Sequence, residues 1–249
     1  MNRTMLIAGC SHAAGLEIIT TDDSTINRQK SFGNLLANKI GYTPVNIATS
    51  GCGNAAIARS VIEWVNSHHD PENTELVVLI AWTESSRMEI PSPVDCYYKS
   101  ANMCSDDYSF TNDMFLRINF GMPTLTLSSE DKSRIEYYQE FMANNLSYLE
   151  ILSANYILQL EYFLKMKNIK YAMCETMQLF SENRHIKPYL DMIDTSYYMN
   201  FNNKEESFWW KYKNLGFVNE NAKYWHHSSI PHELFAESLL AFIDEGNQY

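Results

Sequence analysis

One uninterrupted apolar stretch, residues 75–82, restricts the possible folds of this chain more than any other feature. Its sequence, Glu-Leu-Val-Val-Leu-Ile-Ala-Trp, shows no alternation of apolar and polar residues. A continuous run of this length is typical of a strand buried on both faces, as in a parallel sheet covered by helices on both sides. The stretch therefore predicts a central strand of a parallel sheet.

Shorter strand patterns alternate with helical patterns along the rest of the chain. Strands are predicted at residues 4–9, 44–48 and 168–174, and helices, from the spacing of apolar residues, at 31–40, 55–65, 131–167 and 231–243. The longest helix is expected to break near Asn144 and Asn145, and Gly41 stands where a helix C-cap belongs. The alternation predicts a three-layer α/β/α, flavodoxin-like fold with a mostly parallel sheet of about five strands. We expect residues 1–249 to form one domain, with insertion-like regions at about 90–130 and 176–224.

The acidic charge balance excludes some classes of partner. Lys and Arg number 19 and Asp and Glu 30, so the formal net charge is −11. Nucleic acids and anionic membranes are bound by clustered basic residues, so we expect neither partner. No apolar run approaches the ~20 residues that span a bilayer, and the apolar stretch at residues 5–8 is too short for a signal peptide, so a cytoplasmic location is expected. Five irregularly spaced cysteines without a CxxC pair predict neither disulfides nor a zinc site.

Polar residues follow each predicted strand, at the sheet edge where ligands of α/β proteins bind. Gly9, Cys10, Ser11 and His12 follow the first strand, and a turn containing Gly51 and Gly53 follows the second. The segment from Trp82 to Glu89 begins at the end of the third strand, and His226 and His227 precede the last helix. A serine, glycine-rich turns and histidines at one edge are the groups that a serine nucleophile, oxyanion donors and a general base require.

At these positions the sequence resembles the SGNH (GDSL-type) hydrolase superfamily. Residues 7–12 are similar to its first block, with Cys10 in place of Asp, and residues 46–54 are similar to its second block. More narrowly, the stretch from Trp82 through Arg87 to Glu89 resembles uncharacterised SGNH-like proteins of tailed phages. The resemblance implies a serine esterase or deacetylase that acts on an acyl ester such as an O-acetylated carbohydrate, without a cofactor or metal.

The resemblance also implies roles for individual residues. Ser11 would be the nucleophile, and His226, with His227 as the alternative, would be the base. The backbone N–H groups of Ser11 and Gly51, with the Thr83 hydroxyl, would bind the oxyanion. The residues expected to contact substrate are His12, Asn54, Trp82, Glu84 and Arg87.

Two further departures from the family pattern lie in its third and last blocks. Thr83 replaces the oxyanion Asn of the third block, and Lys223 and Tyr224 stand where the Asp that orients the histidine belongs. Glu220 or Glu84 is a candidate replacement for that Asp, and a Ser-His dyad without a carboxylate is the other option. A second functional hypothesis is therefore a binding or structural protein that retains the fold without catalysis.

Several residues also have alternative interpretations. Ser11 could be a helix N-cap, and Gly51 and Gly53 could serve only to allow positive φ in a turn. Arg87 and Glu89 could form an ion pair with each other. The histidines at 226, 227 and 232 match no common zinc spacing. A nucleotide-binding module is disfavoured because residues 9–15 lack a Walker A lysine and GxGxxG spacing. The aromatic residues could form either a sugar-stacking platform or core; they are Trp209, Trp210, Tyr212, Tyr224 and Trp225.

Overall fold

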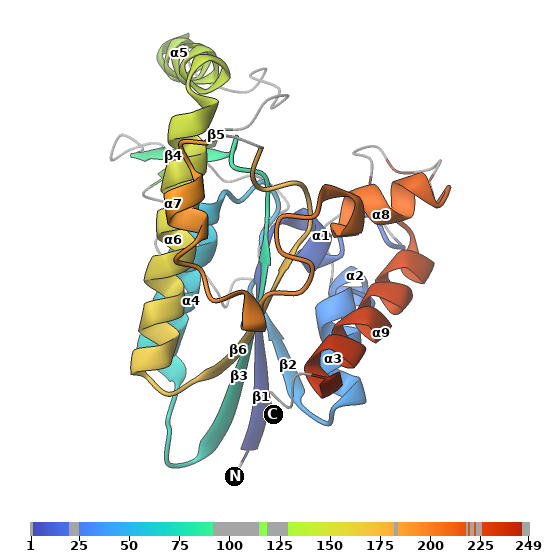
Figure 1. The fold of residues 1–249 in the computed structure, drawn as a ribbon. Helices are drawn as coiled ribbons and strands as arrows, with labels where there is room; N and C mark the ends of the chain where they lie inside the picture. Colours follow the sequence, from blue (N-terminus) through green and yellow to red (C-terminus); the bar gives the residue numbers. More distant parts are fainter. Residues whose placement is uncertain are drawn as a thin grey trace.

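A four-stranded parallel sheet forms the centre of the molecule (Figure 1). The computed structural model describes residues 2–19, 25–91, 115–118, 129–181, 184–217, 219, 222 and 226–245. The sheet has the order β2-β1-β3-β6, and its strands are β1 (Asn2–Gly9), β2 (Thr43–Asn46), β3 (Thr74–Trp82) and β6 (Lys170–Glu175). The predicted mostly parallel α/β sheet is confirmed, with four strands instead of about five in the described part of the chain.

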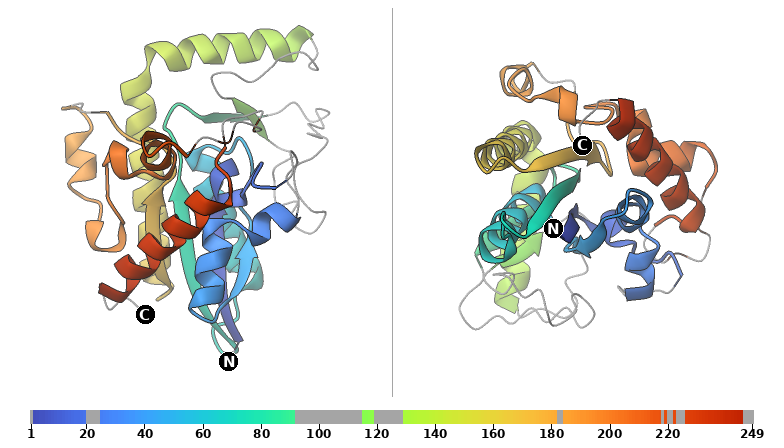
Figure 2. Two further views of the ribbon diagram at one scale, coloured as in Figure 1. Left: turned by 90° about the vertical axis from the view of Figure 1, so that its right-hand side faces the viewer. Right: turned by 90° about the horizontal axis from the view of Figure 1, so that it is seen from below.

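Helices cover both faces of this sheet, which explains the continuous apolar run of the central strand. Helices α4 (Asn54–His68) and α6 (Leu146–Met166) pack on one face, and α3 (Phe32–Lys39) and α9 (Ser229–Glu245) pack on the other (Figure 2). Successive side chains of a strand point to opposite faces. Val78 and Ile80 therefore join the core under α4 and α6, and Val77 and Leu79 join the core under α3 and α9.

The predicted ends of two helices are confirmed in detail. The long helical stretch breaks at Asn145, between α5 (Ser129–Asn144) and α6, and α5 projects at a steep angle from the rest of the molecule (Figure 2). Gly41 has a φ of 74° after α3, and the next residue, Tyr42, donates its backbone N–H to the Ala37 carbonyl at 2.8 Å. A left-handed residue at this position lets the chain leave the helix while its last carbonyls remain hydrogen-bonded.

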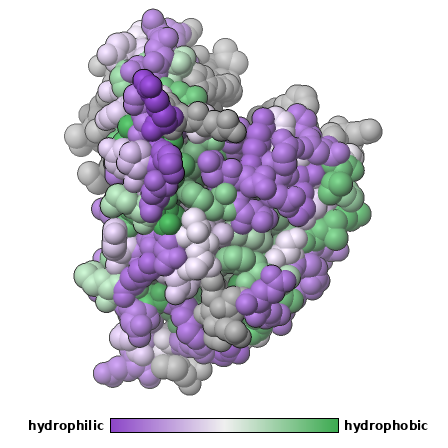
Figure 3. All heavy atoms as spheres, in the orientation of Figure 1, coloured by the Kyte–Doolittle hydropathy of each residue, from purple (hydrophilic) through white to green (hydrophobic). Residues whose placement is uncertain are grey.

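Short elements complete the described chain. Near the edge where β1 ends lie α1 (Ser11–Ala14) and α2 (Thr25–Gln29), and β4 (Met88–Pro91) pairs antiparallel with β5 (Phe115–Ile118). The predicted irregular region 176–224 contains α7 (Lys187–Leu190), η2 (Thr195–Tyr197), η3 (Lys204–Glu206) and α8 (Phe208–Asn214). Much of the other one, at about 90–130, lies outside the described residues. Hydrophilic side chains predominate on the face shown in Figure 3, and no described helix is long and apolar enough to cross a bilayer.

The sheet register brings the ends of β1 and β3 to the same level. Gly9 is paired with Ala81, so the segments that follow the two strands begin side by side. A Cβ on Gly9 would lie 2.6 Å from the Ala13 Cβ and 2.9 Å from the Ala81 carbonyl oxygen. Glycine therefore lets α1 begin immediately after β1, at the carboxyl edge of the sheet.

Candidate active site

Ser11 is the first residue of α1 and is buried at the carboxyl edge of the sheet. The N-cap of this helix is Cys10, and no side chain caps its backbone N–H groups, so the interpretation of Ser11 as an N-cap is wrong. The Cys10 thiol, in the place of the family Asp, lies 3.3 Å from the Thr176 hydroxyl. Within the described residues the Ser11 hydroxyl has no hydrogen-bond partner, so it remains available to a substrate.

A buried carboxylate holds the predicted histidine base, but it comes from an unexpected place. Glu17 Oε2 lies 2.8 Å from His226 Nδ1, and the two side chains are only 1% and 7% exposed. A carboxylate at Nδ1 fixes the tautomer in which Nε2 lacks a proton. No other described residue is hydrogen-bonded to Nε2, so this nitrogen can accept a proton.

Glu17 belongs to the turn that follows α1. Its φ of 63° is in the left-handed region, where a non-glycine side chain other than Asn or Asp is uncommon. The Asn219 amide donates to the Glu17 carbonyl oxygen at 3.1 Å, and Asn27 Oδ1 accepts the Ile19 N–H at 2.8 Å. Glu17 could not be recognised from the sequence, because it precedes the histidine by 209 positions. Of the two expected replacements, Glu84 pairs elsewhere and Glu220 lies outside the described residues.

The alternative base, His227, is bound on both sides of its ring. Nδ1 lies 2.7 Å from the Phe217 carbonyl oxygen and Nε2 lies 3.1 Å from that of Trp209. Neither nitrogen faces an open position, and burial lowers the pKa of this imidazole. His226 is therefore the histidine whose surroundings fit a general base.

Two further histidines are buried around Phe208, which also contacts the His227 ring. The His12 ring lies 4.9 Å from the His226 ring and 5.6 Å from Phe208, measured between centroids. Burial, together with His226 and Arg87, lowers the pKa of His12 well below its ordinary value, so His12 is neutral. His232 accepts the Phe32 N–H at Nδ1, and it is a packing residue. Within the described residues no cluster of His, Cys, Asp or Glu could hold a metal ion.

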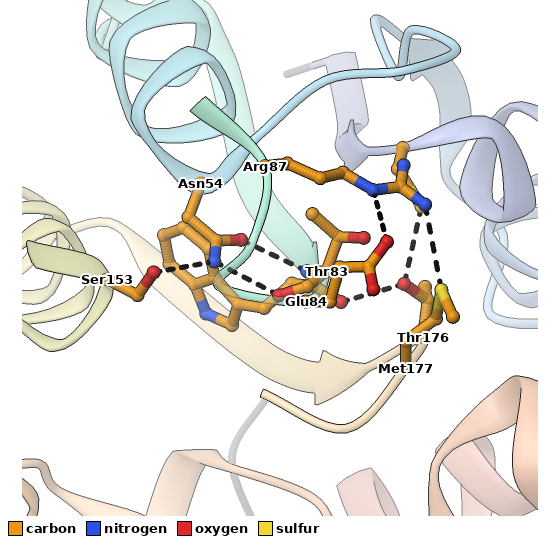
Figure 4. A network of polar contacts seen from close by, with 9 residues as sticks. Asn54, Thr83, Glu84, Arg87, Ser153, Thr176 and Met177 are labelled. Carbon is orange, nitrogen blue, oxygen red and sulfur yellow. Dashed lines mark hydrogen bonds and ion pairs between the residues drawn. The ribbon is translucent and has the colours of Figure 1, made fainter. Parts of the chain in front are cut away.

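The Asn54 side chain, which was expected to contact substrate, is hydrogen-bonded to the backbone of the segment after β3 (Figure 4). Its amide accepts the Thr83 N–H and donates to the Thr83 carbonyl, both at 3.0 Å, and it also donates to Ser153 Oγ at 3.1 Å. The Thr83 hydroxyl is buried and has no hydrogen-bond partner among the described residues. Asn54 therefore fixes the backbone that carries the candidate oxyanion hydroxyl.

The two glycines of the second turn serve different purposes. Gly51 has a φ of 73°, as a positive-φ turn requires. Gly53 has a φ of −92°, so the positive-φ interpretation is wrong for this residue. A Cβ on Gly53 would lie 2.6 Å from the Arg87 carbonyl oxygen, so glycine is required there for the close approach of two segments.

Two other predicted contacts are revised by the structure. Trp82, expected to contact substrate, is fully buried in the core, and its indole N–H points to the Met173 sulfur at 3.3 Å. Arg87 and Glu89 do not pair with each other. Arg87 Nε donates to Glu84 Oε1 at 2.9 Å, and Glu89 accepts from Arg59 at 3.0 and 3.1 Å.

The three aromatic residues of this group that the structure describes divide between the core and the surface. Tyr212 is buried in the core, as the core interpretation expects. Trp209 and Trp210 are partly buried, with Lys213 Nζ 4.3 Å and Lys204 Nζ 4.0 Å from their respective ring centroids. A lysine therefore covers one face of each of these indoles. Tyr224 and Trp225 lie outside the described residues.

Comparison with solved structures identifies proteins of the same fold. The chain is similar in structure to a carbohydrate esterase family 2 enzyme of Corynascus thermopiles (Myceliophthora fergusii), with a TM-score of 0.50 and 10% sequence identity. This match covers 100% of this chain and 68% of the enzyme. A protein of Desulfitobacterium hafniense described as lipolytic and of the G-D-S-L family matches with a TM-score of 0.42 and 11% identity, over 96% and 99%. The first of these matches shows that the chain shares the α/β fold of that enzyme.

A third structural match differs in length from this chain. It is a carbohydrate esterase whose active site is described as having divergent catalytic and non-catalytic binding functions, with a TM-score of 0.46 and 12% identity. The match covers 98% of this chain but 65% of the esterase. No family model and no curated protein matches the sequence. The likeness at these identities therefore concerns the fold alone.

Proposed function

We propose that this protein is a serine esterase in which Ser11, His226 and Glu17 form the catalytic triad. The observation that carries the proposal is the buried Glu17–His226 pair, with 2.8 Å between Oε2 and Nδ1, at the sheet edge where Ser11 begins α1. Moving a carboxylate and an imidazole out of water is costly, so a buried pair of this kind adds little to stability. Its value is in orienting the imidazole and stabilising the imidazolium that forms during acyl transfer.

The triad would act in two half-reactions. Ser11 Oγ attacks the ester carbonyl while His226 Nε2 takes the hydroxyl proton, and the proton then passes to the leaving alcohol. A water molecule deprotonated by the same nitrogen then attacks the acyl-enzyme. The bond to Ser11 Oγ breaks, Nε2 returns the proton to Oγ, and the carboxylic acid leaves. The Glu17 carboxylate stays beside Nδ1 in both half-reactions and does not take up a proton.

The oxyanion would be held by the Ser11 and Gly51 backbone N–H groups and by the Thr83 hydroxyl. Two facts support the role of Thr83: its hydroxyl has no other partner in the described part of the chain, and Asn54 fixes its backbone from both sides. A hydroxyl can donate one hydrogen bond, as the family Asn would. Loss of one oxyanion donor costs about 10²–10³ in rate, so the threonine matters to the rate.

The substrate we propose is a small acyl ester, such as an O-acetylated carbohydrate. The net charge of −11 disfavours phosphate-rich polymers as substrates. The structural match with a carbohydrate esterase family 2 enzyme supports an acylated sugar as the class to test first. No step of the proposed reaction requires a cofactor or a metal.

A second candidate is a binding protein that retains the fold without catalysis. It is favoured by one observation: within the described residues the Ser11 hydroxyl is hydrogen-bonded to neither His226 nor His227. Such contacts are often long in the absence of substrate and shorten in the reacting complex. The Glu17–His226 pair supplies the carboxylate whose absence at residues 223 and 224 suggested a lost activity.

A fluorophosphonate probe separates the two candidates. We expect it to label the wild-type protein covalently, and Ser11→Ala and His226→Gln to abolish labelling. Two matched controls should still be labelled: His227→Gln, at the neighbouring imidazole, and Ser85→Ala, which removes a buried serine at the same edge that donates to the Leu179 carbonyl. A folded wild-type protein that resists the probe would leave the binding protein as the remaining candidate.

A further inference from the structure

Arg87 is a nearly buried cation whose hydrogen-bonding capacity is largely unused. Its side chain is 12% exposed, and its one ionic partner among the described residues is Glu84, which is 34% exposed and accepts from Nε at 2.9 Å. One terminal nitrogen faces the Met177 sulfur at 3.6 Å, and a thioether is a weak acceptor. In the described part of the chain neither terminal nitrogen of this guanidinium has an oxygen partner.

The guanidinium lies at the edge of the sheet that carries the triad. Figure 4 shows Arg87 extending from the segment after β3 toward Met177 and Thr176, which follow β6. The Thr176 hydroxyl in turn contacts the thiol of Cys10, the residue before Ser11, at 3.3 Å. The charge of Arg87 also reaches His12, whose pKa it helps to lower. Arg87 is thus within the neighbourhood of the nucleophile, and the backbone at Gly53 packs against its carbonyl.

The position of Arg87 is fixed before any ligand binds. A Cβ at Gly53 would meet its carbonyl oxygen at 2.6 Å, and the Glu84 carboxylate holds the Nε edge of the side chain. The edge formed by the two terminal nitrogens then faces away from Glu84. Two parallel N–H groups in this fork match the two oxygens of a carboxylate, which is the arrangement that distinguishes arginine from lysine.

We propose that Arg87 binds a carboxylate of the substrate, so that the preferred ester is an acylated sugar acid and not an acylated neutral sugar. Arg87 would bridge two carboxylates, with Nε on Glu84 and the terminal nitrogens on the substrate. The local cation also compensates for the acidic net charge of −11, which would otherwise repel such a substrate. The specificity inference rests on the proposed esterase function, but it concerns binding and can be tested without turnover.

The test measures binding to the Ser11→Ala variant, which cannot turn over an ester. Titration calorimetry with methyl glucuronoside and methyl glucoside compares two sugars that differ in the carboxylate. We expect the glucuronoside to bind about 10- to 100-fold more tightly, as the loss of one charge-assisted pair predicts. Arg87→Gln should remove this preference, and Arg87→Lys, which retains the charge without the fork, should retain part of it.

Arg3→Gln provides the matched control. Arg3 lies at the start of β1, at the opposite edge of the sheet, where it pairs with Glu75 and is about half exposed. This variant loses the same charge and should keep the full preference. Equal affinity for the two sugars, or a preference that survives in folded Arg87→Gln protein, would overturn the inference.

Hydrolysis of the O-acetyl derivatives of both sugars, followed by acetate release, distinguishes the two proposals. An Arg87-dependent binding preference without Ser11-dependent hydrolysis would contradict the esterase and leave the carboxylate site standing. Ser11-dependent hydrolysis at equal kcat/KM for both sugars, unaffected by Arg87→Gln, would support the esterase and contradict the carboxylate site.

Discussion

Replacing Glu175 with Gln should change how the stability of the protein depends on pH. Glu175 ends β6, and its buried carboxyl group accepts the backbone N–H of Asn202 at 2.8 Å and that of Leu179 at 3.4 Å. Burial raises its pKa from 4.5 to about 7 in spite of these hydrogen bonds. The folded protein therefore keeps a proton on Glu175 up to near-neutral pH, whereas the unfolded chain loses this proton above about 4.5.

The direction and size of the effect follow from this difference. Between pH 4.5 and 7 the unfolded state binds fewer protons than the folded state, so the free energy of unfolding decreases as the pH rises. A pKa difference of about 2.5 is equivalent to about 3 kcal/mol. Buried His12, His227 and His232 act in the opposite direction, since their lowered pKa values reduce stability as the pH falls below 6.5. The Glu175→Gln variant isolates the carboxyl contribution, because the amide has the shape of the protonated acid.

Urea unfolding followed by tryptophan fluorescence, for both proteins from pH 5 to pH 8, measures the difference. Near pH 5 the variant should be less stable by no more than about 1 kcal/mol, since its amide NH₂ cannot accept the weak bond from Leu179. Near pH 8 it should be more stable by about 2–3 kcal/mol. A difference between the two proteins that stays constant across this range would refute the reasoning, because Glu175 would then titrate alike in the folded and unfolded states.

Three further predictions concern the candidate site and the segments around it. Glu17→Gln should lower kcat on 4-nitrophenyl acetate by about 10²–10⁴-fold, with little change in KM or melting temperature, because the imidazole loses its fixed tautomer; an unchanged kcat would exclude Glu17 from the triad. Gly53→Ala should lower the free energy of urea unfolding by about 1–3 kcal/mol, since the new Cβ meets a backbone carbonyl. Asn54→Ala leaves both backbone groups of Thr83 unpaired and should cost about 3 kcal/mol, whereas Ser153→Ala, which removes a single bond to that amide, should cost about 1 kcal/mol; equal losses would contradict the assigned role of Asn54.

The central layers of the fold could be predicted because their signals are local. The apolar run of β3 indicates burial on both faces, and the structure places helices on both faces. The helix break at Asn145 and the left-handed conformation of Gly41 could also be predicted from the sequence, because each depends on residues within one or two turns of helix. Elements such as α1 and α8 were missed, since four and seven residues are too few to show a helical period.

Ion pairs were harder to predict than strands. In the segments that follow the strands, two charged residues that are close in sequence need not pair with each other. Arg87 and Glu89 are two positions apart, yet β4 begins at Met88 and directs Glu89 toward Arg59 of α4. Arg87 remains before this strand, in the turn that carries Glu84. The backbone of Arg87 packs closely against Gly53, and this tertiary contact decides which partners Arg87 and Glu89 reach.

The same reasoning explains why a departure from a sequence motif need not mean a lost site. A carboxylate at Nδ1 orients a histidine base, and this role depends on a position in space and not on a distance along the chain. α1 begins at the end of β1, and the ring of His12 on this helix lies 4.9 Å from that of His226, which precedes α9. A turn with Gly15 and Glu17 both at positive φ follows α1 and brings the carboxylate to the ring. Non-glycine residues at positive φ are strained and cluster at functional sites, so the backbone of Glu17 is an independent reason to regard the pair as functional.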